Sequence, residues 1–220
     1  MSSDGASARE GSAGRGTLIA VVGPSGAGKD SLLTYARERL GPDPAILFVR
    51  RVITRPAAID AEDHASLSVD AFLAAQAAGL FAVAWEAHGL HYAIPATVHR
   101  HLASGGVAVV NGSRTALPAI RSAFGHAVTV QVTCRPDILA ARLAARGRED
   151  IDHQQARLAR SVATTEAGTE TVRIDNSDDL ATAGDAFVAA IRGYMDDRRR
   201  ASPAALHSSS FATAAARLRS

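Results

Sequence analysis

Residues 23–31, GPSGAGKDS, have the types and spacing of a phosphate-binding loop. In the pattern Gly-x-x-x-x-Gly-Lys, glycines let backbone N–H groups converge on a phosphate, and the lysine reaches the β- and γ-phosphates. Ser or Thr normally follows the lysine and helps to hold magnesium, but this chain has Asp30 there. A carboxylate also binds that ion. We therefore expect phosphoryl transfer, with Mg²⁺ held by Asp30 and Ser31. The predicted nucleotide-binding residues are Gly23, Pro24, Ser25, Gly26, Ala27, Gly28, Lys29, Asp30 and Ser31.

The use of lysine supports a working loop. The chain has 24 Lys and Arg residues in total, and Lys29 is the only lysine among them. A compact ammonium group that reaches between phosphates is not replaceable by a planar guanidinium. A chance match would not place the one lysine at this position, so we predict Lys29 to be catalytic together with Asp30.

A second group of candidates is a cluster of arginines late in the chain. Arg142 and Arg146 are four residues apart on one face of a predicted helix, and Arg148 follows Gly147. With Arg157 they are predicted to form a lid over about 142–160 that neutralises the transferring phosphoryl group and excludes water. The alternative is an ordinary solvated helix face in an arginine-rich chain.

A third group is polar and lies at the ends of predicted strands, where open α/β sheets bind ligands. Any single histidine in it has a structural alternative, but together these residues describe a pocket for an anionic, hydroxyl-rich acceptor. The candidates are Arg51, Arg55, Glu62, His64, Glu86, His88, Tyr92, Asn111 and Arg114.

The elements that must position these residues alternate along the chain. The apolar run 17–22 predicts a buried strand, the glycine loop follows, and 29–40 has an apolar helical stripe that ends at Gly41. Ser68 is the expected N-cap of a helix, and Pro95 the expected first turn of another. The alternation predicts an α/β fold with a parallel sheet covered by helices on both faces. Further strands are expected at 46–53, 81–89, 107–113, 127–134 and 171–177, and further helices at 68–79, 95–106, 115–124, 135–147, 152–167 and 180–195.

Length and composition favour one domain with two tails. We expect a disordered leader at 1–15, a domain at 16–195 with a substrate-binding region at about 50–95, and a poorly ordered tail at 196–220. The formal net charge of +2 argues against a nucleic-acid binder, and no apolar run approaches the length of a membrane span. The single Cys134 and the lack of a signal peptide at the N-terminus favour the cytoplasm. The oligomeric state stays open.

In order along residues 17–195, the motifs resemble the guanylate-kinase-like branch of P-loop kinases. The segments that carry this are GPSGAGK, TRP at 54–56, WEAHGLHYAIP at 85–95, RLAARGR at 142–148 and DNSDDL at 175–180. The chain departs from guanylate kinase itself in the GMP half. Ala57-Ala58 stands where that enzyme has a second arginine, and Glu62-Asp63-His64-Ala65 stands where it has Asp-Tyr-His-Phe.

The combination GPSGAGKDS, RVITRP, EDH, AHGLHYAIP and VNGSR resembles more closely the ribose 1,5-bisphosphate phosphokinases of phosphonate breakdown. That resemblance implies transfer of a phosphoryl group from ATP to ribose 1,5-bisphosphate, giving 5-phosphoribosyl 1-diphosphate, with Asp30 as part of the family pattern. Asn111 stands near an acidic position of guanylate kinase, so we hypothesise that Asp30 supplies the charge that Asn111 lacks. The alternatives are guanylate kinase, another small-phosphate kinase, and a non-catalytic binding module, although such modules tend to lose the loop lysine.

Overall fold

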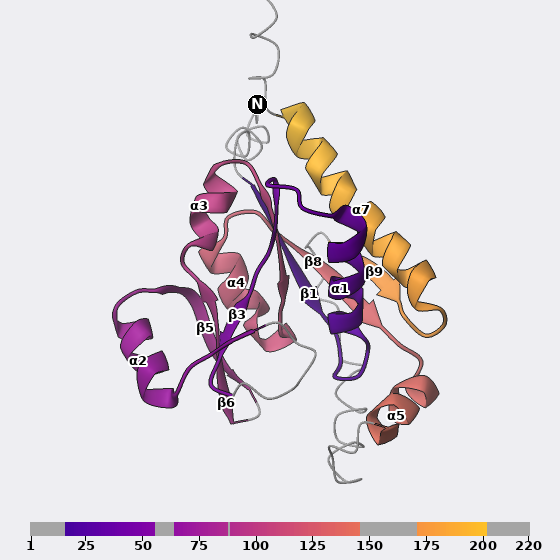
Figure 1. The fold of residues 1–220 in the computed structure, drawn as a ribbon, viewed down its shortest axis with the longest axis horizontal. Helices are drawn as coiled ribbons and strands as arrows, with labels where there is room; N and C mark the ends of the chain where they lie inside the picture. Colours follow the sequence, from indigo (N-terminus) through magenta and orange to yellow (C-terminus); the bar gives the residue numbers. More distant parts are fainter. Residues whose placement is uncertain (1–15, 56–63, 88, 146–170, 202–220) are drawn as a thin grey trace, which may run out of the picture.

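The fold is a parallel sheet with a smaller mixed sheet beside it (Figure 1). The computed structural model describes residues 16–55, 64–87, 89–145 and 171–201. The large sheet has the order β2 (Ile46–Phe48), β7 (Val107–Asn111), β1 (Thr17–Val22), β8 (Ala127–Thr133) and β9 (Thr171–Asp175), and all its pairs are parallel. The helices are α1 (Lys29–Leu40), α2 (Val69–Ala77), α3 (Val98–Ala103), the short 3₁₀ turn η1 (Arg114–Ala116), α4 (Leu117–Ala123), α5 (Pro136–Ala145) and α7 (Leu180–Ala201).

Alternation along the central strand β1 divides the core into two layers. Ile19 and Val21 pack with α1 and α7 on one face, whereas Leu18 and Ala20 pack with α3 and α4 on the other. Strands that are buried on both faces read as continuous apolar runs, as β1 does. The predicted fold class, a parallel sheet with helices on both faces, is confirmed.

The smaller sheet has the order β4 (His64–Ser66), β3 (Arg51–Ile53), β6 (Leu90–Pro95) and β5 (Phe81–Ala87). β3 pairs parallel with β4 and antiparallel with β6, and β5 and β6 form an antiparallel pair. Helix α2 closes one face of this sheet through Phe72, which packs against Val52 and Ala93. Ser68 caps α2 as predicted, since its Oγ accepts a hydrogen bond from Ala71 N at 3.2 Å.

The structure corrects several predicted boundaries. The strand expected at 46–53 is two strands, because the chain leaves the large sheet after Phe48 and enters the small sheet at Arg51. Pro95 ends β6 instead of beginning a helix, since a strand end tolerates the missing N–H, and α3 begins at Val98. The closing helix α7 continues to Ala201, beyond the predicted end at residue 195. Strands β4 and β6 were not predicted.

Several other predictions fall outside the described residues. These are the leader at 1–15, the helix at 152–167, most of the lid, and the tail beyond residue 201. Among the helices in the described ranges, none has the length and apolar character needed to cross a bilayer.

The packing of α1 against α7 depends on a glycine. A Cβ atom added at Gly184 would collide with the ring of Tyr35, whereas one added at Gly193 in the same helix would meet nothing within 4 Å. The Tyr35 hydroxyl donates to Asp185 Oδ1 at 2.7 Å, which holds the ring in this place.

These two glycines give a matched test of the α1–α7 contact. Gly193→Ala should raise the free energy of unfolding by about 0.5–1 kcal/mol, because alanine is the better helix former. Gly184→Ala should instead lower it by about 1–3 kcal/mol, because the ring of Tyr35 must move. Chemical denaturation measures both, and equal stabilisation by the two substitutions would contradict the packing described here.

Candidate functional site

The predicted phosphate loop connects the end of β1 to the start of α1. Gly26 and Gly28 have φ values of 82° and 87°, in the left-handed region that favours glycine. A Cβ atom at Gly28 would collide with the side-chain amide of Asn176, and one at Gly23 would collide with the carbonyl oxygen of Val132. The loop therefore follows the ends of β8 and β9 so closely that side chains at these two positions have no room.

Asn176, directly after β9, holds the loop from behind. Its Nδ2 donates to the carbonyl oxygen of Ala27 at 2.8 Å, and its backbone N–H donates to Thr133 O at 2.9 Å. Arg142 Nη1 donates to the carbonyl oxygen of Asn176 at 2.8 Å. Asn176 is only 2% exposed. It was not among the predicted site residues, although DNSDDL had marked its segment.

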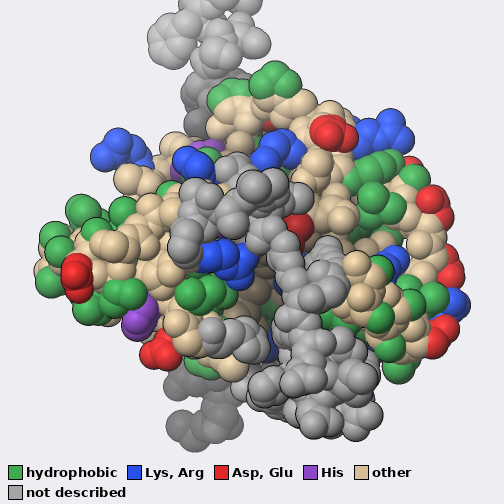
Figure 2. All heavy atoms as spheres, turned by 60° about the horizontal axis from the view of Figure 1, so that its bottom comes forward, with side chains coloured by type: hydrophobic (Ala, Val, Ile, Leu, Met, Phe, Trp, Pro, Cys, Tyr) green, Lys and Arg blue, Asp and Glu red, His purple; other side chains and the backbone are tan. Residues whose placement is uncertain are grey.

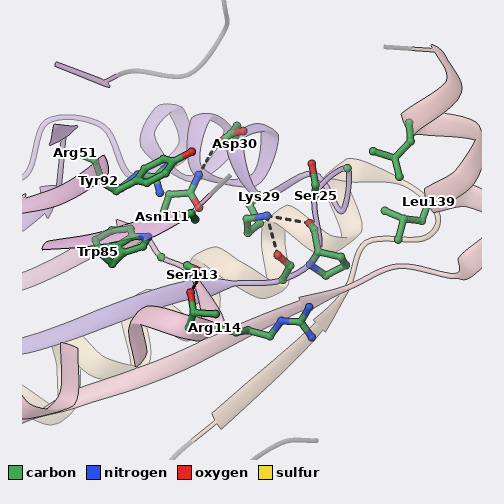
Figure 3. Close-up of a pocket in the computed structure, with 18 of the residues that line it drawn as sticks. Ser25, Lys29, Asp30, Arg51, Trp85, Tyr92, Asn111, Ser113, Arg114 and Leu139 are labelled. Atoms are coloured by element: carbon green, nitrogen blue, oxygen red, sulfur yellow. Dashed lines mark hydrogen bonds between the residues drawn. The ribbon is translucent and has the colours of Figure 1, made fainter. Parts of the chain in front are cut away.

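Lys29 is the first residue of α1. Its Nζ donates to the carbonyl oxygens of Gly23 at 3.0 Å and Pro24 at 2.9 Å, so the ammonium group lies over the loop (Figure 3). The start of the helix adds partial positive charge at the same place. Ammonium, helix start and left-handed glycines together form an anion-binding concavity.

Asp30 lies against the end of the neighbouring strand β7. Asn111 Nδ2 donates to Asp30 Oδ1 at 2.6 Å, so the first turn of α1 supplies the carboxylate and the strand supplies the amide. Asn111 is only 9% exposed, so the amide of this pair is nearly buried. Asp30 and Asn111, which the sequence analysis linked only as a hypothesis, are therefore in direct contact.

One cavity of about 370 Å³ runs from the loop to the small sheet. In Figure 3, Lys29, Asp30 and Asn111 lie near its centre, with Arg51, Tyr92 and Trp85 on one side and Leu139 on the other. Lys and Arg side chains gather near the middle of the same face of the molecule (Figure 2). The lining residues are Gly23, Pro24, Ser25, Gly26, Gly28, Lys29, Asp30, Arg51, Arg55, Trp85, Ala87, Tyr92, Asn111, Gly112, Ser113, Arg114, Thr115, Leu139 and Leu143.

Aromatic rings and an arginine form the side of the cavity away from the loop. The rings of Trp85 and Tyr92 are stacked, with centroids 5.5 Å apart and planes inclined by 11°. The guanidinium carbon of Arg51 lies 5.4 Å from the centroid of the Tyr92 ring. Arg51 and Tyr92 are only 7% and 8% exposed. This cluster of three side chains combines positive charge with aromatic surface.

Most of the predicted site residues within the described ranges line the cavity. Those that do are Gly23, Pro24, Ser25, Gly26, Gly28, Lys29, Asp30, Arg51, Arg55, Tyr92, Asn111 and Arg114. Ala27 is buried beneath the loop, where its carbonyl oxygen accepts from Asn176.

Besides Ala27, four predicted residues within the described ranges do not line the cavity. Glu86 alternates with Trp85 and Ala87 on β5, and it is these two neighbours that line the cavity. His64 belongs to the edge strand β4, and Ser31 is exposed on α1. Arg142 lies behind the loop on Asn176. The other predicted residues, Glu62, His88, Arg146, Arg148 and Arg157, fall outside the described residues.

The cavity lining also includes seven residues that were not among the predicted site residues: Trp85, Ala87, Gly112, Ser113, Thr115, Leu139 and Leu143. Strict alternation from Trp85 to Ala87 could have assigned Trp85 to the cavity and removed Glu86.

Known proteins share this fold and sequence to different degrees. The sequence matches the AAA domain family over residues 19–163. The solved structure of guanylate kinase from Anaplasma phagocytophilum aligns with a TM-score of 0.61, covering 83% of this chain and 87% of that one, at 16% identity. Identity this low supports the shared fold and says nothing of the acceptor.

Curated relatives match much more strongly. Ribose 1,5-bisphosphate phosphokinase PhnN of Agrobacterium fabrum is 46% identical over 167 residues, which are 76% of this chain and 91% of the relative. The protein of the same name from Chelativorans sp. is 46% identical over 179 residues, or 81% of this chain and 86% of the relative. The chain therefore belongs to the ribose 1,5-bisphosphate phosphokinase family.

Proposed function

We propose that the protein transfers the γ-phosphoryl group of ATP to ribose 1,5-bisphosphate, forming 5-phosphoribosyl 1-diphosphate and ADP, in phosphonate breakdown. The observation that carries this proposal is the continuity of the cavity. One space of about 370 Å³ joins a phosphate loop with Lys29 to Arg51, Arg55 and Arg114. Such a space suits a donor triphosphate and a doubly phosphorylated acceptor side by side. The names of the relatives support this acceptor.

The chemistry requires little beyond position and charge. An oxygen of the acceptor's 1-phosphate forms a bond to the γ-phosphorus, and the bond from that phosphorus to the β–γ bridging oxygen breaks, so that ADP leaves with the electron pair. The attacking oxygen is already anionic at neutral pH, so no general base is needed. Catalysis then consists of alignment and neutralisation of charge on the phosphoryl oxygens.

The loop end of the cavity suits the donor. Backbone N–H groups from Gly26 to Lys29 would surround the β-phosphate, and the Lys29 ammonium would move from its two carbonyl partners to bridge the β- and γ-phosphates. Asn176 would fix the loop through Ala27, and Arg142 would act through Asn176. Arg142 is thus a positioning residue in this proposal.

The arginine side of the cavity suits the acceptor. Arg51 on β3, Arg55 just after it and Arg114 on η1 would bind its phosphate groups. Asn111 and Tyr92 would shape the space between the two ends. The lid arginines Arg146, Arg148 and Arg157 remain proposed contacts to the transferring group.

The donor set fits magnesium when phosphates share the ion. No group of three or more His, Cys, Asp or Glu side chains that could hold a metal occurs within the described residues. Magnesium usually takes one or two carboxylates together with substrate phosphates and water. Asp30 is such a carboxylate, oriented by Asn111 beside the loop. The bound ion would neutralise phosphate charge.

Product identification tests the proposed reaction. Purified protein given ATP, Mg²⁺ and ribose 1,5-bisphosphate should form 5-phosphoribosyl 1-diphosphate and ADP in equal amounts, as measured by ³¹P NMR. With GMP in place of the sugar bisphosphate, the rate of ADP formation should stay at the acceptor-free level. GDP as the main product would overturn the proposal in favour of guanylate kinase.

Lys29 provides a direct test of the loop's role. Lys29→Ala should lower kcat by at least about 100- to 1,000-fold, because a donor aimed at the developing charge is lost. The kcat of Lys29→Arg should also stay far below the wild-type value, since a guanidinium cannot take the place of a compact ammonium. Steady-state kinetics and circular dichroism would separate lost catalysis from lost fold. Near-wild-type kcat for Lys29→Ala would contradict the mechanism.

Because Asp30 and Asn111 are in contact, we predict that the carboxylate can be supplied from either position of the pair. Asp30→Asn keeps the size of the side chain but removes the charge, and it should lower kcat by about 100-fold and raise the Mg²⁺ concentration for half-maximal rate. The double substitution Asp30→Ser with Asn111→Asp returns a carboxylate to the same contact, so it should recover much of the loss. A magnesium titration of each variant measures this.

Asp70→Asn serves as the matched control, because Asp70 lies in the first turn of α2, outside the cavity. If the rate of Asp30→Asn depends on the Mg²⁺ concentration as the wild-type rate does, Asp30 is not a ligand of the metal. If the kcat of the double variant does not exceed that of Asp30→Asn, the carboxylate is required at position 30 itself.

A further inference from the structure

We propose that Trp85 determines acceptor specificity by presenting its indole ring to the sugar of the acceptor. This inference rests on the proposed function and names the residue that recognises the part of the acceptor between its phosphates. Trp85 is the only tryptophan of the chain, and it lines the cavity on the side of Arg51 and Tyr92 (Figure 3).

The strand β5 directs Trp85 to the cavity. The pairing of β5 with β6 shifts register between Phe81 and Val83, so that these two residues face different layers although they are two positions apart. Phe81 packs with Phe72 of α2, whereas Val83 and Trp85 pack with the core layer of α3 and α4. Such bulges redirect side chains beside binding sites.

The indole is held in a fixed orientation. Trp85 and Tyr92 are direct cross-strand partners, and their rings stack at 5.5 Å. Tyr92 in turn lies beside the guanidinium of Arg51, and both of these residues are nearly buried. Because Tyr92 stacks on Trp85 across the strand pair, packing restricts the orientation of the indole that borders the cavity.

The chemistry of this wall matches a phosphorylated sugar. A sugar ring has a face of C–H groups that can pack on an aromatic surface, whereas a free phosphate or pyrophosphate has none. The arginines that line the cavity come from β3, from the segment that follows it and from η1, so two phosphates on one ring can meet separate cations. A nucleobase could also stack on indole. A nucleoside monophosphate would bring only one phosphate to a side of the cavity that is lined by three arginines. The observations therefore favour the sugar bisphosphate.

The single tryptophan gives a binding assay without catalysis. Titration of the wild-type protein with ribose 1,5-bisphosphate, in the absence of ATP, should change the intensity or wavelength of tryptophan emission in a saturable way. Inorganic pyrophosphate should bind the arginines and give a much smaller change. Because Trp85 is the only tryptophan of the chain, any change in tryptophan emission reports on this ring. An unchanged emission spectrum at saturating acceptor, or an equal response to pyrophosphate, would overturn the proposal.

Kinetics test the same role independently. Trp85→Ala should raise KM for ribose 1,5-bisphosphate by about 10- to 100-fold through the loss of buried apolar contact, and leave KM for ATP within about twofold. Trp85→Phe should restore most of the affinity because it keeps an aromatic face. Phe81→Leu, at the other end of β5 and outside the cavity, should leave both KM values near wild type.

The outcomes separate the two levels of the proposal. If the wild-type protein forms product but Trp85→Ala keeps the wild-type KM, the role of Trp85 is refuted and the proposed function stands. If the wild-type protein makes no product while its emission responds to the sugar bisphosphate, the proposed reaction fails and the sugar site stands. Saturable quenching by GMP that exceeds the response to the sugar bisphosphate would refute the assignment of the wall to a sugar.

Discussion

The close approach of the phosphate loop to the ends of β8 and β9 is the constraint on which the rest of the site depends. Gly23 and Gly28 have no space for a Cβ atom because Val132 and Asn176 occupy it. At this contact Asn176 Nδ2 donates to the Ala27 carbonyl oxygen, which fixes the loop against the end of β9. It also sets where α1 begins, and therefore where Lys29 and its neighbour Asp30 are placed. An anion site of this kind comes from backbone geometry first and from side chains second.

Once α1 begins at this point, the unusual Asp30 has a physical explanation. Its carboxylate meets the amide of Asn111 across the gap between the loop and β7. A carboxylate on both positions would repel, and a hydroxyl facing an amide would leave the site without an anionic ligand. One charge and one neutral donor satisfy both conditions. Asp30 is thus one half of a complementary pair whose other half lies 81 residues further along the chain.

The sequence predicted the parts of the site that are local and missed the parts that depend on tertiary pairing. The loop, Lys29 and the capping of α2 by Ser68 follow from short patterns, and the structure has each of them. The run 46–53 reads as one apolar strand because no local signal marks its passage from one sheet to the other. Glu86 was among the predicted site residues and Trp85 was not, yet Trp85 and Ala87 line the cavity and the alternating Glu86 does not. Asn176, which holds the loop from behind, bonds to Thr133 and Ala27, 43 and 149 residues away. These separations are too long for any local pattern to reveal.

The two sides of the cavity are proposed to bind two anions, the donor triphosphate on one side and the acceptor on the other. A triphosphate and a sugar bisphosphate repel strongly, so alignment for transfer requires cations that need no rearrangement when the acceptor arrives. Arg51, proposed to bind the acceptor, suits this condition, since it is nearly buried and lies beside the ring of Tyr92. The same ring stacks on Trp85, so the residues proposed to neutralise charge and to recognise the acceptor's apolar face share one support. A change at Tyr92 would therefore disturb both at once, whereas a change at Trp85 would leave Arg51 with its aromatic partner. This asymmetry makes the indole the place where acceptor specificity can vary while phosphate binding is maintained.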